Sequence, residues 1–195
     1  MQVGVDEVGL GSLAGPLVVG AVVLDSARDI EGLRDSKKVS AKARDEISQE
    51  IFDQALFWSI GIATKKEIEE MNVLAASHLA MQRAIFNLAI TPSLVLVDGK
   101  NNPRLPFPTK TVVKGDDKVR EISAASIIAK VCRDKIMEGL SASFPQYEFE
   151  RNKGYPTKKH LMALNSFGPT VLHRRTFAPV SSILGNQMKI SALHG

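Results

Sequence analysis

Cysteine and long hydrophobic runs are both scarce in this sequence. Cys132 is the only cysteine among 195 residues, so no internal disulfide can form, and we expect a reducing, cytoplasmic location. The longest apolar stretch, residues 13–24, is interrupted by glycine and proline. Acidic residues stand at positions 6 and 7, where a secretory signal would be basic and then apolar. The sequence therefore indicates neither a membrane span nor export.

Internal repeats and low-complexity segments are missing as well. We therefore expect one domain over residues 1–180 and a short C-terminal tail over residues 181–195. Apolar residues make up 44% of the chain, which is enough for a buried core. The formal net charge of +4 suits a polyanionic partner such as nucleic acid, although it would suit many ordinary proteins equally well.

Hydrophobic periodicity predicts five strands and several helices. Runs of β-branched and other apolar residues predict strands at residues 1–5, 17–24, 57–63, 93–97 and 109–113. Apolar residues at helical spacing predict helices that begin at Ser40, span residues 72–89 and 121–137, and begin again near Thr157. This order of segments favours an α/β fold in which helices pack on a mixed sheet.

Three acidic residues have the same position relative to the predicted strands. Asp6, Asp98 and Asp116 each come at or just after the end of a strand or its turn. Acids that converged there without a base would repel one another, so convergence makes sense only if divalent cations neutralise them. Mg²⁺ prefers such oxygen ligands together with a substrate phosphate. On spacing alone, these acids could equally be solvated turn residues.

The glycine-rich segment 9–14 allows a second interpretation. Its letters, GLGSLA, formally match the dinucleotide-binding pattern G-x-G-x-x-G/A. That pattern must open a helix whose N-terminus binds pyrophosphate, whereas here Pro16 and a β-branched strand follow. Asp6 and Glu7 would also place negative charge beside the pyrophosphate. We therefore reject a dinucleotide site.

Five sequence blocks, each weak alone, occur in a specific order along the chain. They are residues 4–11 (GVDEVGLG) with 13–16 (LAGP), 35–38 (DSKK), 97–99 (VDG), 113–116 (VKGD) leading to 122–130 (ISAASIIAK), and 153–157 (KGYPT) with His160 and 173–177 (HRRTF). In this order they resemble the bacterial ribonuclease HII family over nearly the whole chain. The resemblance implies a ribonuclease H-like fold, with a mixed five-stranded sheet flanked by helices and a C-terminal helical segment.

The resemblance also implies a metal-dependent endonuclease. Such an enzyme hydrolyses the RNA strand of RNA–DNA hybrids and incises 5′ to single ribonucleotides in duplex DNA, leaving 3′-hydroxyl and 5′-phosphate ends. Two ions, Mg²⁺ or Mn²⁺, carry the catalysis. Matching positions give the catalytic and metal-binding set Asp6, Glu7, Asp98 and Asp116. Asp117 and Asp134 compete for the fourth place, but we expect Asp134 to form an ion pair with Lys130.

Substrate contacts follow from the same resemblance. In the family, main-chain atoms of the turn that corresponds to Gly9, Leu10 and Gly11 contact the 2′-hydroxyl. Lys37, with Lys38 as a substitute, matches a phosphate-binding position, and Tyr155 matches a tyrosine on the sugar just 3′ of the ribonucleotide. Leu10 and Ser12 replace an arginine and a proline of the family pattern. Because a cation is lost beside the scissile phosphate, we expect weaker substrate binding than in the family.

Two other functions are weighed against this one. A hybrid-binding protein without catalysis is conceivable because of Leu10, but all four acids are present. Ribonuclease HIII or another nuclease of the same fold superfamily is the enzymatic alternative, and the Tyr155 block favours HII. We expect a monomer that does not associate with a membrane. Four further residues are expected as follows: Trp58 in the core, His78 packed, and His160 and His173 structural or facing substrate.

Overall fold

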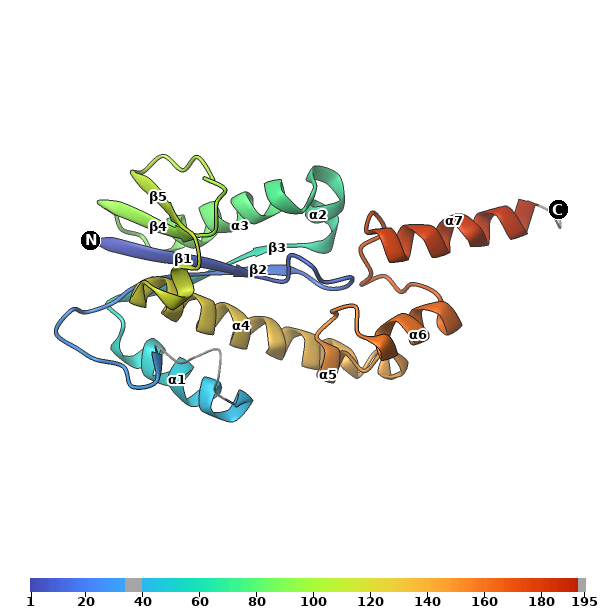
Figure 1. Cartoon of the computed structure of the whole chain (residues 1–195), viewed down its shortest axis with the longest axis horizontal. Helices are drawn as coiled ribbons and strands as arrows, with labels where there is room; N and C mark the ends of the chain where they lie inside the picture. The colour runs from blue at the N-terminus through green and yellow to red at the C-terminus, as the bar shows by residue number, and fades with distance from the viewer. Residues whose placement is uncertain (34–39, 193–195) are drawn as a thin grey trace.

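A five-stranded mixed sheet forms the centre of the protein in the computed structural model (Figure 1). The structure describes residues 1–33 and 40–192, with side chains up to residue 185. The strand order is β3-β2-β1-β4-β5. The strands are β1 (Gln2–Val8), β2 (Leu17–Val23), β3 (Phe57–Ala63), β4 (Leu94–Asp98) and β5 (Thr109–Val112). The predicted mixed five-stranded sheet is therefore confirmed.

The central strand β1 pairs over different lengths with its two neighbours. With β2 it is antiparallel as far as the pair Val8 and Val18. With β4 it is parallel, and the pairing ends at Val5 and Val97. Because β2 continues to pair with it, β1 extends beyond the predicted end at residue 5, and Asp6 lies within the strand rather than after it.

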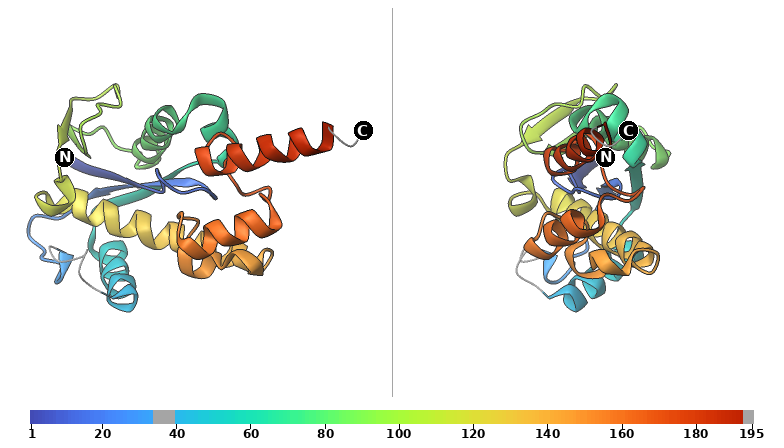
Figure 2. Two further views of the ribbon diagram at one scale, coloured as in Figure 1. Left: turned by 45° about the vertical axis from the view of Figure 1, so that its right-hand side comes forward. Right: turned by 90° about the vertical axis from the view of Figure 1, so that its right-hand side faces the viewer.

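Helices cover both faces of the sheet. Helices α2 (Lys65–Met71) and α3 (Val73–Asn87) lie over one face, and α4 (Arg120–Ser141) runs along the other (Figures 1 and 2). Helix α1 (Ala41–Gln54) packs on the outer side of α4 (Figure 2). None of the helices in these described ranges is long and apolar enough to cross a membrane.

Glycines bring α4 into direct contact with the sheet. A Cβ atom on Gly4 would lie 2.1 Å from the backbone carbonyl carbon of Glu121. A Cβ atom on Gly20 would lie 2.3 Å from the carbonyl oxygen of Ala125. Backbone atoms cannot move aside as the end of a flexible side chain can, so both positions require glycine. This contact fixes the start of α4 next to β1.

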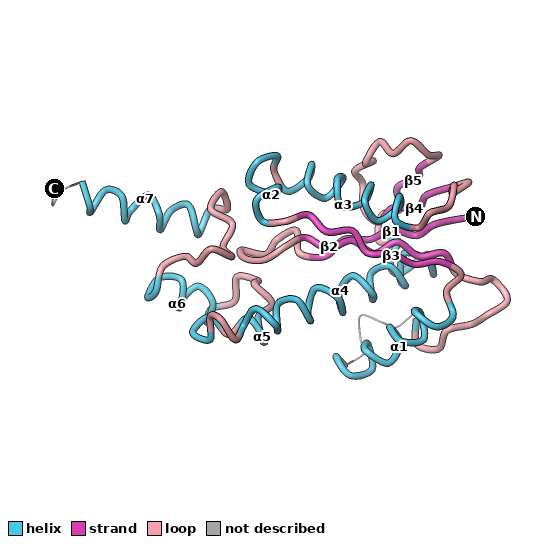
Figure 3. Tube along the Cα trace, turned by 180° about the vertical axis from the view of Figure 1, so that it is seen from behind, coloured by secondary structure: helices cyan, strands magenta, loops and turns pink. Residues whose placement is uncertain are grey.

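Three short helical segments and two longer helices complete the fold. Segment η2 (Gly115–Asp117) precedes α4, and η3 (Pro145–Tyr147), α5 (Phe149–Asn152), α6 (Lys158–Phe167) and α7 (Ala178–Ala192) follow it. Figure 3 shows α5 beside the C-terminal end of α4, with α6 and α7 at the same end of the molecule. Helix α7 includes most of the segment expected as a tail, and its Val180, Ile183 and Leu184 pack in an apolar cluster with Met137 and Phe149. The boundary predicted at residue 180 thus falls inside a helix.

The prediction for Trp58 was wrong, and helix α2 was not predicted. Trp58 lies on the edge strand β3, is 43% exposed and packs its ring 4.5 Å from the ring of Phe52. An edge strand has a face that α3 and α4 do not fully cover, so a strand pattern does not guarantee burial. Helix α2 is only seven residues long, too short for a helical period to be recognised, and a capping box at Thr64 and Glu67 begins it.

His160 and His173 form a buried pair in the C-terminal part. Both are 0% exposed, and their Nε2 atoms lie 3.0 Å apart. His160 Nδ1 donates to the carbonyl oxygen of Tyr155, so its Nε2 is the acceptor. His173 Nδ1 accepts from the backbone N–H of Thr170, so its Nε2 is the donor. Both rings are therefore neutral, and their role is structural.

We predict that this pair makes the fold sensitive to acid. Burial, followed by the charges of His160 and Lys65, lowers the pKa of His173 from 6.5 to about 4. Between these two pH values the unfolded chain binds more protons than the folded protein. The contribution of His173 to the free energy of unfolding is therefore complete above pH 6.5 and is lost as the pH falls toward 4. At 1.4 kcal/mol for each pKa unit, the loss is about 3 kcal/mol.

Urea unfolding at pH 7.5, 6.0, 5.0 and 4.5 measures this loss. Glu7 acts in the opposite sense, because its pKa is raised to about 7. The comparison is therefore between the wild type and His173→Asn, whose difference in unfolding free energy should shrink as the pH falls. A constant difference across this range would show that His173 does not titrate as described.

Candidate active site

The sheet places Asp6 and Asp98 side by side. Their preceding residues, Val5 and Val97, are partners in the parallel pairing of β1 with β4. Side chains alternate along a strand, and both valines belong to the buried apolar cluster that the sheet forms with α3. Asp6 and Asp98 therefore both face α4, one strand apart. The expectation that strand ends bring these two acids together agrees with this geometry.

Asp116 reaches the same place from η2. The backbone N–H of Gly115 donates to Asp98 Oδ1 at 2.6 Å and so ties the loop to the end of β4. A Cβ atom on Gly115 would lie 2.6 Å from Ile122 Cδ1 and 3.3 Å from Asp98 Oδ1, so a glycine suits this contact. Lys114 precedes it with a left-handed φ of 55° and turns the chain from β5 into η2.

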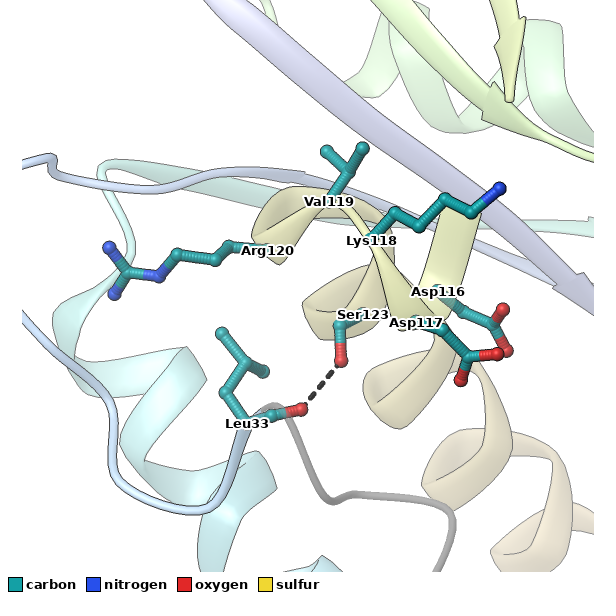
Figure 4. Close-up of a pocket in the computed structure, with 7 residues that line it drawn as sticks. All are labelled: Leu33, Asp116, Asp117, Lys118, Val119, Arg120 and Ser123. Carbon is teal, nitrogen blue, oxygen red and sulfur yellow. Dashed lines mark hydrogen bonds between the residues drawn. The ribbon is translucent and has the colours of Figure 1, made fainter. Parts of the chain in front are cut away.

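A hollow of about 290 Å³ opens beside this third acid. In Figure 4, Asp116 and Asp117 point the same way from η2, whereas Arg120 points to the opposite side. On the wall of the hollow, Ser123 Oγ donates to the carbonyl oxygen of Leu33 at 2.7 Å. The hollow thus lies between η2, the start of α4 and the chain before residue 34.

Burial of the acids, together with their mutual repulsion, dominates the electrostatics of the site. Burial raises the pKa of Asp6 well above its ordinary value, and the charges of Glu7, Asp98 and Asp116 raise it further. Burial and the charge of Asp98 raise the pKa of Glu7 to about 7. The backbone N–H of Glu7 donates to Asp6 Oδ1 at 2.8 Å, and this hydrogen bond offsets only part of the rise in the pKa of Asp6. The charge of Asp116 acts on Asp6, which agrees with Asp116 as the expected fourth acid.

The donor chemistry of these acids suits a hard divalent cation. Glu7 Oε2 is buried and accepts no hydrogen bond in the structure. An unpaired buried carboxylate oxygen is costly, and a cation would satisfy it. In the described part of the chain, however, no three Asp, Glu, His or Cys side chains are arranged to hold one ion as they stand. Binding therefore requires the carboxylates to rotate toward each other, which their mutual repulsion opposes until a cation is present.

The turn of Gly9, Leu10 and Gly11 lies just after the acidic end of β1. Gly9 has a φ of +100°, and a Cβ atom there would lie 2.4 Å from Arg133 Nε. A Cβ atom on Gly11 would meet nothing within 4 Å. Leu10 is 38% exposed. The protein itself therefore needs glycine at position 9, whereas at position 11 the space is open to solvent.

Tyr155 is half-buried and held from several sides. Its ring lies under the guanidinium of Arg133, with the carbon Cζ 5.3 Å from the ring centroid. Its backbone N–H donates to the carbonyl oxygen of Asn152 at 2.9 Å, and its carbonyl accepts from His160. Lys37 and Lys38, the expected phosphate contacts, lie outside the described residues.

Two residues near the turn were missed by the sequence analysis. Arg133 and Arg174 are both 0% exposed. Arg133 stands four residues after Ala129, on the predicted apolar side of its helix, and this spacing could have indicated a buried arginine. Arg174 lies in a quoted sequence block that carried no assigned role. The expected ion pair of Asp134 with Lys130 is confirmed.

Comparisons with known proteins agree with this architecture. A family model described as Ribonuclease HII matches residues 3–180. The ribonuclease H2 of Pyrococcus horikoshii OT3 is 28% identical, with a TM-score of 0.76 over 93% of this chain and 96% of that one. The ribonuclease HII of Archaeoglobus fulgidus, solved in a complex with PCNA, is 25% identical, with a TM-score of 0.77 over 94% and 96%.

A more distant structure shares the fold alone. Bst-RNase HIII in complex with Mn²⁺ is 20% identical, with a TM-score of 0.73 over 94% of this chain and 69% of that one. The family match covers most of the sequence, and the two more similar structures cover nearly all of both chains. The chain therefore belongs to the ribonuclease HII family and is a ribonuclease H.

Proposed function

We propose that this ribonuclease H hydrolyses the RNA strand of RNA–DNA hybrids and also incises 5′ to single ribonucleotides in duplex DNA, leaving 3′-hydroxyl and 5′-phosphate ends. The observation that carries the proposal is the meeting of Asp6, Asp98 and Asp116 on one side of the sheet, with Glu7 beside them. Such a concentration of buried negative charge is unfavourable in a protein that does not bind cations there.

Asp6, Glu7, Asp98 and Asp116 would hold Mg²⁺ or Mn²⁺. When bound as a pair, the ions supply an activated water and stabilise the leaving oxygen of a phosphodiester. The hydrogen bond from Gly115 holds Asp98 in place. Burial and neighbouring carboxylates raise the pKa values of Asp6 and Glu7, because they destabilise the ionised form. A bound cation would stabilise that form and would therefore replace the proton.

Two elements would recognise the sugars. The turn of Gly9, Leu10 and Gly11 would approach the 2′-hydroxyl with main-chain atoms, which the open space at Gly11 permits. Tyr155 would pack on the neighbouring sugar, since the residue is only half-buried while its backbone is held. Leu10 offers no cation to the phosphate between them, so binding should depend more on these two contacts.

We predict that Asp98→Asn abolishes cutting without weakening the fold. Asparagine keeps an Oδ1 atom that can accept from Gly115, and one negative charge is removed from a repelling cluster. The measurement is cleavage of labelled duplex DNA with one ribonucleotide, in Mg²⁺ or Mn²⁺ and in EDTA. The melting temperature in EDTA should equal or exceed that of the wild type.

Asp134→Asn is the matched control for this experiment. Asp134 forms an ion pair with Lys130 and has no place in the proposed site, so its loss should leave cutting unchanged. Cutting by Asp98→Asn at the wild-type rate would remove Asp98 from the site. A wild type that binds the duplex without cutting it in either metal would favour the hybrid-binding alternative.

We also predict that alanine at position 11 affects activity, whereas alanine at position 9 affects stability. Gly11→Ala enters open space and should change the unfolding free energy by less than about 0.5 kcal/mol, yet slow ribonucleotide cleavage about tenfold because the methyl group blocks backbone approach. Gly9→Ala is strained by its φ and collides with Arg133, so it should cost roughly 1–3 kcal/mol of stability. Urea unfolding and cleavage rates separate the two, and a Gly11→Ala enzyme of full activity would disprove the role of Gly11.

A further inference from the structure

Two fully buried arginines lie beneath the glycine turn. The carbonyl oxygens of residues 9–16 receive most of the hydrogen bonds that Arg133 and Arg174 donate. Every acceptor that the structure gives these two side chains is a carbonyl or a hydroxyl oxygen. Burying a guanidinium without a carboxylate is unfavourable, so its N–H groups must all find hydrogen-bond acceptors. A small displacement that breaks these hydrogen bonds would therefore destabilise the fold.

Arg133 joins two separate parts of the chain. Toward the turn, its Nε donates to the carbonyl oxygen of Pro16 at 2.9 Å, and its Nη2 donates to that of Ala14 at 3.1 Å. Toward the C-terminal part, its Nη1 donates to the carbonyl oxygen of Lys153 at 2.8 Å, and its guanidinium covers the ring of Tyr155. One rigid, planar group thus sets the separation of the glycine turn from Tyr155.

Ser12 adds a contact that the proline of the family pattern could not make. Its side chain is fully buried, and its Oγ accepts from Arg133 Nη2 at 2.7 Å. Hydrogen bonds to a charged group are stronger than those between neutral groups. In this chain the departure at position 12 therefore strengthens the hold of Arg133 on the turn.

Arg174 holds the same turn, and it interacts with Tyr155 through charge alone, without stacking on its ring. Its Nη1 donates to the carbonyl oxygens of Gly9 and Leu10 at 2.7 and 3.1 Å, and its Nε donates to that of Gly15 at 3.1 Å. Its guanidinium lies over the ring of Phe177 rather than that of Tyr155. Arg174 therefore provides a natural comparison, because it is equally buried and supports the same turn.

We propose that Arg133, held by Ser12, is a positioning residue that sets the distance between the glycine turn and Tyr155, and so determines the preference for a single ribonucleotide over continuous RNA. This inference rests on the proposed function, in which the two elements contact neighbouring sugars. A lone ribonucleotide in DNA fits only in the one register that satisfies both elements. In continuous RNA every register offers a 2′-hydroxyl to the turn, so an altered distance matters less.

The test compares kcat/KM on two duplexes of the same sequence, one with a single ribonucleotide and one with a continuous RNA strand. Arg133→Lys keeps the charge but loses the planar group. It should lower kcat/KM for the single ribonucleotide about tenfold more than for continuous RNA. Ser12→Ala removes one hydrogen bond to Arg133 and should shift the same ratio about threefold in the same direction.

Control variants separate positioning from general damage. Arg174→Lys should lower both values by a similar factor, and Arg151→Lys, at a residue whose side chain is 71% exposed, should change neither. If Arg133→Lys does not fold, as judged by circular dichroism and thermal melting, Ser12→Ala decides the question. An unchanged ratio in folded Arg133→Lys, or in Ser12→Ala where Arg133→Lys is unfolded, would overturn the inference while leaving the proposed function intact. A wild type that cuts neither duplex would overturn both.

Discussion

Repulsion among acids at the end of the central strand is the constraint on which the rest of the structure depends. Asp6 and Asp98 are adjacent because β1 and β4 are parallel and stop pairing one residue before them. Asp116 joins them because η2 is tied to Asp98 and because α4 rests directly on the glycines of β1 and β2. Bringing these charges together lowers the stability of the fold. Such an arrangement is expected in a protein that binds cations there, and not in one with a purely structural role.

Buried positive charge lies under the turn that follows the acidic end of β1. Arg133 and Arg174 occupy the space under the turn that follows β1, and burial lowers the pKa of Arg174 to about 9. The same arginines connect the N-terminal turn to the C-terminal helical part, which the sheet alone does not hold. The acids therefore lie on one side of the end of β1, and a turn supported by guanidinium groups follows it.

The sequence predicted the sheet and the position of Asp98 at the end of a strand, for physical reasons that also explain the failures. Buried strands such as β4 are continuous apolar runs, so Asp98 at the end of one could be recognised without coordinates. The position of Asp6 inside β1 depends on how far β2 pairs with it, which local pattern does not contain. Arg133 was missed because an arginine is expected at the surface, and only the full set of carbonyls around it explains its burial.

Mn²⁺ binding, followed by electron paramagnetic resonance of the free ion, tests most directly whether the acids form a cation site. The wild type should bind Mn²⁺ saturably, and Asp6→Asn should bind it at least about tenfold more weakly, because Asp6 interacts with all three other acids. Asp134→Asn should bind as the wild type does. Equal Mn²⁺ affinity in the wild type and Asp6→Asn would contradict a cation site at the end of β1.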